Sequence, residues 1–282
     1  MLADTRIAFV GSGAMAEAMI AGLLNQQLVT PRNIIASGPR VERGQQLERQ
    51  YGIGVTADNR AAVNGADVVV LSVKPQTLTG VLHELKQSVA PEALVLSIVA
   101  GARSETIANG LQHPAVVRSM PNTPAQIGQG ITVWTASPHV SSTQRAQAQA
   151  ILGACGQQVF VEDEDYLDMA TAISGNGPAY VFLFMEAMVD AGVHLGFPRH
   201  IAEQRVLQTV KGSVEYVLHS PNHLARLRNQ VTSPGGTSAE ALYYLDKAGF
   251  RTALSRAIWA GYQRAVQLGR GKKRSQLAED KS

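Results

Sequence analysis

Cysteine is almost absent from this chain of 282 residues, in which Cys155 is the single example. An internal disulfide is therefore excluded, and a reducing compartment is permitted. Cys155 lies among small apolar residues, so we expect it in the core. No charged and then apolar leader precedes the first predicted strand, which starts within a few residues of Met1. These features favour a cytoplasmic protein.

Charged and aromatic residues are also scarce, at 17% and 5% of the chain against 45% hydrophobic residues. Basic and aromatic residues do not interleave as they do in nucleic-acid sites, so no nucleic-acid partner is expected. The one dense basic cluster is interpreted as a solvated C-terminal tail. Its members are Arg270, Lys272, Lys273 and Arg274.

Long hydrophobic runs are missing as well. The most apolar helical stretch, Pro178–Val193, carries Glu186 and Asp190, which indicates a buried helix and excludes a membrane span. The seven histidines are scattered, and a proline interrupts the chain between His219 and His223. We therefore expect no membrane contact and no metal site.

Short apolar runs that predict buried strands alternate with helical patterns through the first part of the chain. The predicted strands are Arg6–Val10, Asn33–Ser37, Asp67–Val73, Leu94–Val99, Ala115–Ser119, Ile131–Thr135 and Gln158–Val161. The predicted helices between them are Ala14–Leu24, Val41–Gln50, Gln76–Gln87, Ser104–Leu111 and Thr143–Leu152. This alternation predicts an α/β domain with a Rossmann-type, doubly wound parallel sheet.

The strand pattern ends at the acidic segment Glu162–Asp165, and only helical patterns follow it. We therefore predict an α/β domain over residues 1–164 and an all-α domain over 165–282. The predicted helices are Pro178–Gly196, Pro198–His219, His223–Leu227, Ser238–Ala248 and Arg251–Leu268. Met185 and Met188 are expected in the core. Several helical faces are apolar, more than a small domain can bury alone, which predicts an interface with a second copy of the chain.

A dinucleotide fingerprint follows the first predicted strand and opens the first helix. It is the pattern G-x-G-x-x-A, formed by Gly11, Ser12, Gly13, Ala14, Met15 and Ala16. The first glycine permits a tight turn, the second lets the backbone approach a diphosphate, and the alanine is small enough for close packing. In this context the pattern predicts dinucleotide binding.

The end of the second strand favours NADPH over NADH, which remains possible. An NAD enzyme usually carries an acid there, whereas this chain has Ser37 and then Arg40, which suit a 2′-phosphate. Asn59 could add a hydrogen bond, or it could be a helix cap. At the end of the third strand, Lys74 either approaches the cofactor or is an ordinary strand-end lysine. The rigid segment Arg118–Pro124 lies at the same edge of the sheet.

A glycine-rich turn near the far end of the chain suggests an anion site. Ser233-Pro234-Gly235-Gly236 is followed by a helix for which Thr237 or Ser238 is the expected N-cap, with Glu240 in the first turn. Such a turn aims several N–H groups at one point, as a site for carboxylate or phosphate requires. The alternative is a plain capped helix start.

Together these motifs resemble the pyrroline-5-carboxylate reductase family nearly from end to end. The matching segments are VGSGAMAEAMIAGL, SVKPQ, RSMPNTPAQIGQG, SGNGPAYVFLFMEAMVDAGVHLGFPR and QVTSPGGTSAEAL. The resemblance implies an oxidoreductase of proline biosynthesis that reduces the C=N bond of 1-pyrroline-5-carboxylate with NAD(P)H, giving L-proline. It also implies an interlocked dimer, commonly assembled into decamers.

The resemblance also assigns residues. The cofactor-binding positions of the family match Gly11 to Ala16, Ser37, Asn59, Val73, Lys74 and Pro75. Arg40 is added on the basis of its own chemistry and position, not of the resemblance. Ser233, Gly235, Gly236, Thr237 and Ser238 match the loop that holds the substrate carboxylate, with Ser238 as the catalytic hydroxyl. If the imine arrives as an iminium ion, no strong acid is needed and catalysis is mainly positioning.

Three residues depart from the family pattern and could alter affinity. Asn176 replaces a serine, Ser238 stands where threonine is usual, and Gln230 stands where many relatives have asparagine. Two other functions remain open. One is a different imine or β-hydroxyacid reductase, a class that usually places a catalytic Lys or Asp on this helix. Pro178–Val193 has only Glu186 and Asp190 there, and no lysine. The other is a dinucleotide-sensing interaction protein, against which the intact loop at Ser233 argues.

Overall fold

The computed structural model describes residues 2–269. The basic cluster predicted for the tail, at residues 270–274, lies outside the described residues. The chain divides into two compact units. The sheet unit comprises residues 1–176 and 261–282, of which 2–176 and 261–269 are described, and the helical unit comprises Gly177–Ala260. This division lies further along the chain than the predicted boundary at residue 165, because the segment after the last strand packs on the sheet.

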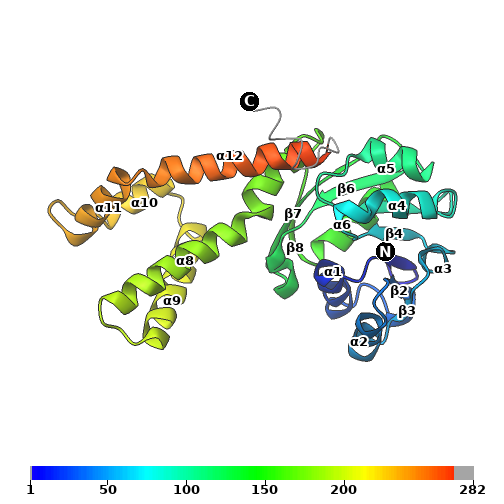
Figure 1. Ribbon diagram of the computed structural model, residues 1–282, viewed down its shortest axis with the longest axis horizontal. Helices are drawn as coiled ribbons and strands as arrows, with labels where there is room; N and C mark the ends of the chain where they lie inside the picture. Colours follow the sequence, from blue (N-terminus) through cyan, green and yellow to red (C-terminus); the bar gives the residue numbers. More distant parts are fainter. Residues whose placement is uncertain (1, 270–282) are drawn as a thin grey trace. The chain divides into compact units, whose positions relative to one another are not determined.

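One eight-stranded sheet organises the sheet unit, in the order β3-β2-β1-β4-β5-β6-β7-β8. The strands are β1 (Ile7–Val10), β2 (Ile34–Ser37), β3 (Gly54–Thr56), β4 (Val68–Leu71), β5 (Leu94–Ser97), β6 (Val116–Met120), β7 (Gly130–Ala136) and β8 (Gly156–Phe160). The helices are α1 (Ala14–Asn25), α2 (Val41–Tyr51), α3 (Asn59–Val63), α4 (Pro75–Leu85), α5 (Ser104–Leu111), α6 (Ser142–Gly153) and α7 (Tyr166–Ala170). Figure 1 shows helices on both faces of this sheet, as a doubly wound fold requires.

The first six strands are parallel, and the order reverses at β1, which has β2 on one side and β4 on the other. This is the Rossmann arrangement that the sequence predicts. Two strands depart from it, since β7 runs antiparallel to β6, pairing Val117 with Ala136, and β8 runs parallel to β7. The connection from β6 is a short 3-10 helix at Thr123–Ile127, too short to return the chain for a parallel strand.

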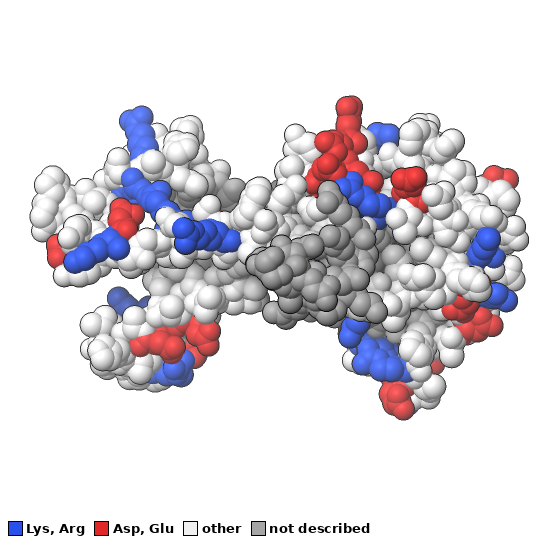
Figure 2. Space-filling view, turned by 45° about the horizontal axis from the view of Figure 1, so that its top comes forward, with Lys and Arg blue, Asp and Glu red and all other residues white. Residues whose placement is uncertain are grey.

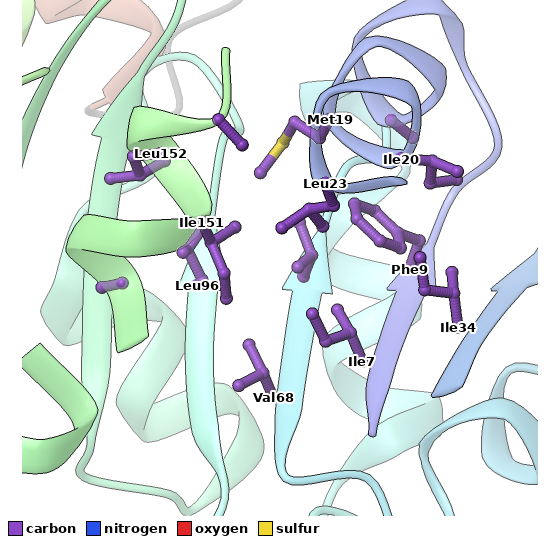
Figure 3. Close-up of a cluster of buried hydrophobic side chains, with 14 of the residues drawn as sticks. Ile7, Phe9, Met19, Ile20, Leu23, Ile34, Val68, Leu96, Ile151 and Leu152 are labelled. Atoms are coloured by element: carbon purple, nitrogen blue, oxygen red, sulfur yellow. The ribbon is translucent and has the colours of Figure 1, made fainter. Parts of the chain in front are cut away.

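Two hydrophobic layers cover the faces of the sheet, and β1 contributes to both. Ile7 and Phe9 face the layer that α1, α2 and α6 cover, whereas Ala8 and Val10 face the layer under α3, α4 and α5. Figure 3 shows Phe9 against Ile20 and Leu23 of α1. Burying a side chain of this size contributes about 1.5–3 kcal/mol. Cys155 is buried in the same layer, as predicted, and burial raises the pKa of its thiol to about 11.

The helical unit contains α8 (Gly177–His194), α9 (Arg199–Leu218), α10 (Leu224–Gln230), α11 (Thr237–Lys247) and the first part of α12 (Phe250–Gly269). In Figure 1, α8 and α9 run side by side. Their buried cluster is Val189, Ala202 and Val206, with Met185 and Met188 packed against it as predicted. No strand occurs in the described residues after Phe160, which confirms the predicted change to helices.

Candidate functional site

The reversal of strand order brings the loops after β1 and β4 together at the carboxyl edge of the sheet. Gly11 follows β1 and has a positive φ of 107°. A Cβ placed on it would lie 2.7 Å from the carbonyl oxygen of Ser72, which follows β4. Ser72 also donates its hydroxyl to the Gly11 carbonyl at 2.7 Å. A side chain at position 11 would force these loops apart, so glycine is required there.

Gly13 opens a cradle in front of α1. It is the N-cap residue of this helix, makes no side-chain cap, and a Cβ built on it meets nothing within 4 Å. The first N–H groups of α1, beginning at Ala14, have no intrahelical partners, and a helix start of this kind attracts an anion. Ala16 is fully buried against the sheet, as the third position of the fingerprint requires. Ser12 and Met15 lie in the same turn, partly buried.

Ser37, at the end of β2, is fully buried at 0% exposure. Its hydroxyl donates to Asn59 Oδ1 at 2.7 Å. Asn59 is the first residue of α3, but it is not the cap that was the alternative interpretation. Asp58 caps this helix instead, accepting from the N–H groups of Arg60 and Ala61. The Asn59 side chain therefore does not cap α3, and Ser37 holds its Oδ1 at the sheet edge.

Arg40 and Arg43 stand at the start of α2 and differ in their surroundings. Arg40 is exposed, and in the part of the chain that the structure describes its guanidinium has no ion pair or hydrogen bond. Arg43 was not predicted. It donates Nε to the Ser12 carbonyl at 2.9 Å and pairs with Glu17 of α1. It therefore braces the glycine loop, and no sequence signal distinguishes it from Arg40.

The loop after β4 presents backbone and an exposed lysine to the same edge. Val73 is partly buried, Lys74 is the N-cap residue of α4, and Pro75 is its first residue. The Lys74 carbonyl accepts from both the N–H and the hydroxyl of Thr77, each at 3.0 Å. These contacts fix the Lys74 backbone, while its side chain extends into solvent.

A further contact at the carboxyl edge of the sheet comes from the segment that follows the last strand. A single π-helical turn, Thr171–Gly175, follows α7. Asn122, in the loop after β6, donates its amide to the Ser174 carbonyl at 3.1 Å and accepts from Ile131 N at 2.9 Å. π turns recur at functional sites. Arg118, at the start of the same motif, is buried in ion pairs with Glu164 and Asp168.

The glycine-rich loop of the helical unit forms the expected turn. Gly235 has a φ of 70°, and Gly236 N donates to the Ser233 carbonyl at 3.0 Å. The predicted cap was wrong: Gly236 is the N-cap residue of α11 and no side chain caps it. Glu240 lies in the first turn, as expected. The helix begins at Thr237, one residue earlier than a Ser238 start, because the glycine adopts the extended cap conformation without a side chain.

This correction sharpens the case for a ligand site. The first N–H groups of α11 lack intrahelical partners, and neither Thr237 nor Ser238 uses its hydroxyl to cap them. Both residues are exposed. Backbone donors and two hydroxyls are thus presented together at one helix start.

Other classes of site find little support in the described residues. None of the described helices combines the length and hydropathy needed to cross a membrane. No group of three or more His, Cys, Asp or Glu residues among them is placed to hold a metal ion. On the face shown in Figure 2, basic and acidic side chains lie in small groups among uncharged ones. That face offers no continuous positive surface for a nucleic-acid backbone.

Comparison with known proteins identifies the family. The chain is 41% identical to a pyrroline-5-carboxylate reductase of Synechocystis over 265 residues, which cover 94% of this chain and 98% of that protein. A Pseudomonas aeruginosa enzyme of the same name is 41% identical over 268 residues, covering 95% and 98% of the two chains. The chain belongs to the pyrroline-5-carboxylate reductase family.

Family descriptions and solved structures agree with this membership. The family described as pyrroline-5-carboxylate reductase dimerisation matches residues 164–268, and the one described as NADP oxidoreductase, coenzyme F420-dependent, matches residues 6–101. A Plasmodium falciparum pyrroline carboxylate reductase structure with NADP bound has a TM-score of 0.87 at 31% identity, covering 94% of this chain and 98% of its own. A reductive aminase from Aspergillus terreus, at 16% identity and a TM-score of 0.59, shares the fold alone.

Proposed function

We propose that this chain is a pyrroline-5-carboxylate reductase that reduces the C=N bond of 1-pyrroline-5-carboxylate with NADPH to give L-proline. One observation carries the proposal. The chain combines the open cradle at Gly13 with a second helix start, at Gly236, which no side chain caps. The first suits a diphosphate and the second a carboxylate. Relatives of this name cover nearly the whole chain, which supports the same conclusion.

The residues of the cradle fit a nicotinamide dinucleotide. When bound, that cofactor supplies the hydride for the reaction. The N–H groups that begin α1 at Ala14 would hold its diphosphate, because Gly13 leaves room for close approach. Lys74 would add a positive charge beside the same loop.

The 2′-phosphate of NADPH would be held by Arg40. The side chain of Ser37 is not acidic, so β2 offers no carboxylate for a ribose 2′-OH. Arg43 is neutralised by Glu17, whereas Arg40 is exposed with its donors unused in the described chain. NADP bound in the Plasmodium relative supports this preference.

The substrate would be held by the loop from Ser233 to Ser238. Backbone N–H groups at Gly235 and Thr237 would bind its carboxylate, whereas the Gly236 N–H already donates to the Ser233 carbonyl. The Ser238 hydroxyl oxygen would accept a hydrogen bond from the protonated ring nitrogen. An iminium nitrogen already carries its proton, so this hydroxyl positions the ring rather than acting as a strong acid. The absence of methyl on Ser238 leaves the hydroxyl but removes one constraint on its rotamer.

The helical unit would make the dimer. Its buried cluster is small, while Phe182 and Leu183 of α8 are 60% and 66% exposed. Apolar exposure of this kind marks an interaction surface. The match of residues 164–268 to the dimerisation family supports a second copy as the partner. A decamer and a cytoplasmic location stay predictions.

Steady-state oxidation of NADPH in the presence of 1-pyrroline-5-carboxylate tests the function, with L-proline identified as the product. Turnover with other cyclic imines but not with this one would favour the rival imine reductase. Cofactor binding without turnover of any imine would favour the dinucleotide-sensing alternative.

A further inference from the structure

Glu84 holds the side-chain amide of Asn59, a residue that matches a cofactor-binding position of the family. Glu84 lies in the last turn of α4 and is partly buried. Its Oε2 accepts from Asn59 Nδ2 at 2.8 Å. On the other side, Ser37 donates its hydroxyl to Asn59 Oδ1 at 2.7 Å. Three elements of the fold therefore converge on one amide group.

The carboxylate decides which way this amide points. An ionised carboxylate can only accept hydrogen bonds, whereas the Ser37 hydroxyl can donate or accept. Nitrogen must therefore face Glu84, and oxygen must face Ser37. Without Glu84, the hydroxyl alone would accept either orientation of the amide.

The fixed amide lies beside the glycine loop. Gly11 N donates to the Ser37 carbonyl at 3.0 Å, so the residue that contacts Asn59 also anchors the turn of the fingerprint. Ser37 is on the β2 side of β1, the side on which a Rossmann fold binds the adenosine half of a dinucleotide. An asparagine amide has two N–H donors, and Glu84 Oε2 accepts one of them.

We propose that Glu84 is a positioning residue for the adenosine half of the cofactor, acting through Asn59. It fixes the amide so that the remaining N–H is presented to the ribose rather than turned toward the protein. The inference rests on the proposed function, because it requires a dinucleotide in the cradle.

If the Glu84 side chain had a purely structural role, its removal would be expected to loosen the junction of α3 and α4. The junction of α3 and α4 has a second contact, in which Arg60 donates Nε to the backbone carbonyl of Glu84 at 2.8 Å. Replacing the Glu84 side chain leaves that contact in place. In the described part of the chain the carboxylate forms no ion pair, so its removal strands no buried cation. The main loss should be orientation of Asn59.

Equilibrium binding without substrate tests this role. NADPH and adenosine 2′,5′-bisphosphate, which lacks the nicotinamide half, would be titrated into the full-length native protein and its variants. Glu84→Ala should weaken the binding of both ligands by about 5- to 10-fold, which lies within the range for one lost neutral hydrogen bond. Glu84→Gln should bind within about twofold of native, since its carbonyl can accept the same bond. The kcat of Glu84→Ala at saturating NADPH should equal that of the native protein.

Two further variants separate coupling from independent effects. Asn59→Ala should weaken binding as much as Glu84→Ala, and the double variant should lose little more, because both remove the same interaction. Glu48→Ala, on the exposed face of α2, is the matched control and should bind as the native protein does. If Glu84→Ala does not fold, Glu84→Met removes the acceptor while keeping the length of the side chain.

The outcomes distinguish the two proposals. If the native protein binds NADPH and Glu84→Ala binds it with the same affinity, the role of Glu84 is overturned and the proposed function stands. Additive losses of affinity in the double variant would have the same consequence. A drop in melting temperature without a change in Kd would also overturn that role. Failure of the native protein to bind NADPH would overturn the proposed function and, with it, this inference.

Discussion

Arg118 and Asp168 form a buried ion pair that ties β6 to α7. The guanidinium Nη2 and the carboxylate Oδ1 are 2.7 Å apart, and each side chain is 2% exposed. Glu164 extends the cluster, accepting from Arg118 at 3.1 Å and from the N–H and hydroxyl of Ser104. Arg103 lies on its outer side, 2.6 Å from Asp165. The charges thus fasten the chain to the sheet where the strands end.

Asp168→Asn should destabilise the protein by about 3 kcal/mol, because it leaves a buried guanidinium without its nearest countercharge. Glu164 remains in place and keeps the loss near the lower end of the range for a broken buried pair. Urea unfolding measures the effect. Asp165→Asn removes an exposed partner of Arg103 and should cost less than about 1 kcal/mol. Equal losses in the two variants would contradict this ranking.

His113 should make stability depend on pH. Burial lowers the pKa of His113, and its contact with the Ala93 carbonyl, 2.7 Å from Nε2, opposes the shift only in part. The folded protein therefore binds fewer protons here than the unfolded chain. Stability from this group is fully present above the unfolded pKa of about 6.5 and is lost as the pH falls through the lower folded pKa.

The comparison of native protein and His113→Gln checks this prediction. Urea unfolding at pH 7 and pH 5 should show a smaller loss on acidification in the variant than in the native protein. The same loss in both would mean that other groups carry the acid sensitivity.

Much of the fold could be predicted because buried parallel strands leave a plain signal. Val68–Leu71 is an uninterrupted apolar run, and all of its residues are fully buried. β3 and α3 were not predicted, because three and five residues give too short a pattern to read. The reversed direction of β7 also left no signal, since burial patterns do not encode strand direction.

The candidate site, like the fold, could be predicted only in part from the sequence. Gly11 and Gly13 could be found because the turn restricts residue type locally. The contact of Asn59 with Glu84 could not, because the residues are 25 apart in sequence and meet only when α3 packs beside α4. The N-cap at Gly236 was missed because residue preferences at N-cap positions favour serine or threonine. In this structure the turn places a glycine at the N-cap instead.

Arg40→Ala should raise KM for NADPH by about 10- to 100-fold, with much less effect on NADH. The reason is loss of a charge-assisted hydrogen bond, about 1.5–3 kcal/mol, to a phosphate that NADH lacks. Steady-state kinetics with both cofactors measures the difference. Arg49→Ala, in the last turn of the same helix, is the control and should change neither value. Equal effects on both cofactors, or a native preference for NADH, would refute the assignment.

The full-length chain should sediment as a dimer or a larger assembly through its helical unit. Leu183→Glu places a charge in an apolar surface of α8 and should weaken self-association, because an unpaired charge is costly to bury at an interface. Sedimentation across a range of concentrations shows the shift. A folded, monodisperse monomer of the native chain would exclude an obligate dimer.

Ser238→Ala should lower kcat/KM by about 10- to 100-fold, as expected for one lost hydrogen bond to a charged group, about 1.5–3 kcal/mol. NADPH binding should barely change, because the dinucleotide cradle is in the sheet unit. Ser238→Thr should keep most activity, since the hydroxyl remains.

Stability measured on the same Ser238→Ala variant gives the decisive contrast. A serine that caps a helix loses about 1 kcal/mol when replaced by alanine. In this structure Gly236 is the cap residue and the Ser238 hydroxyl caps nothing, so the melting temperature should stay at the native value or rise slightly with the better helix propensity of alanine. Unchanged kcat/KM in Ser238→Ala would remove the catalytic role, because the variant lacks the hydroxyl to which that role is assigned.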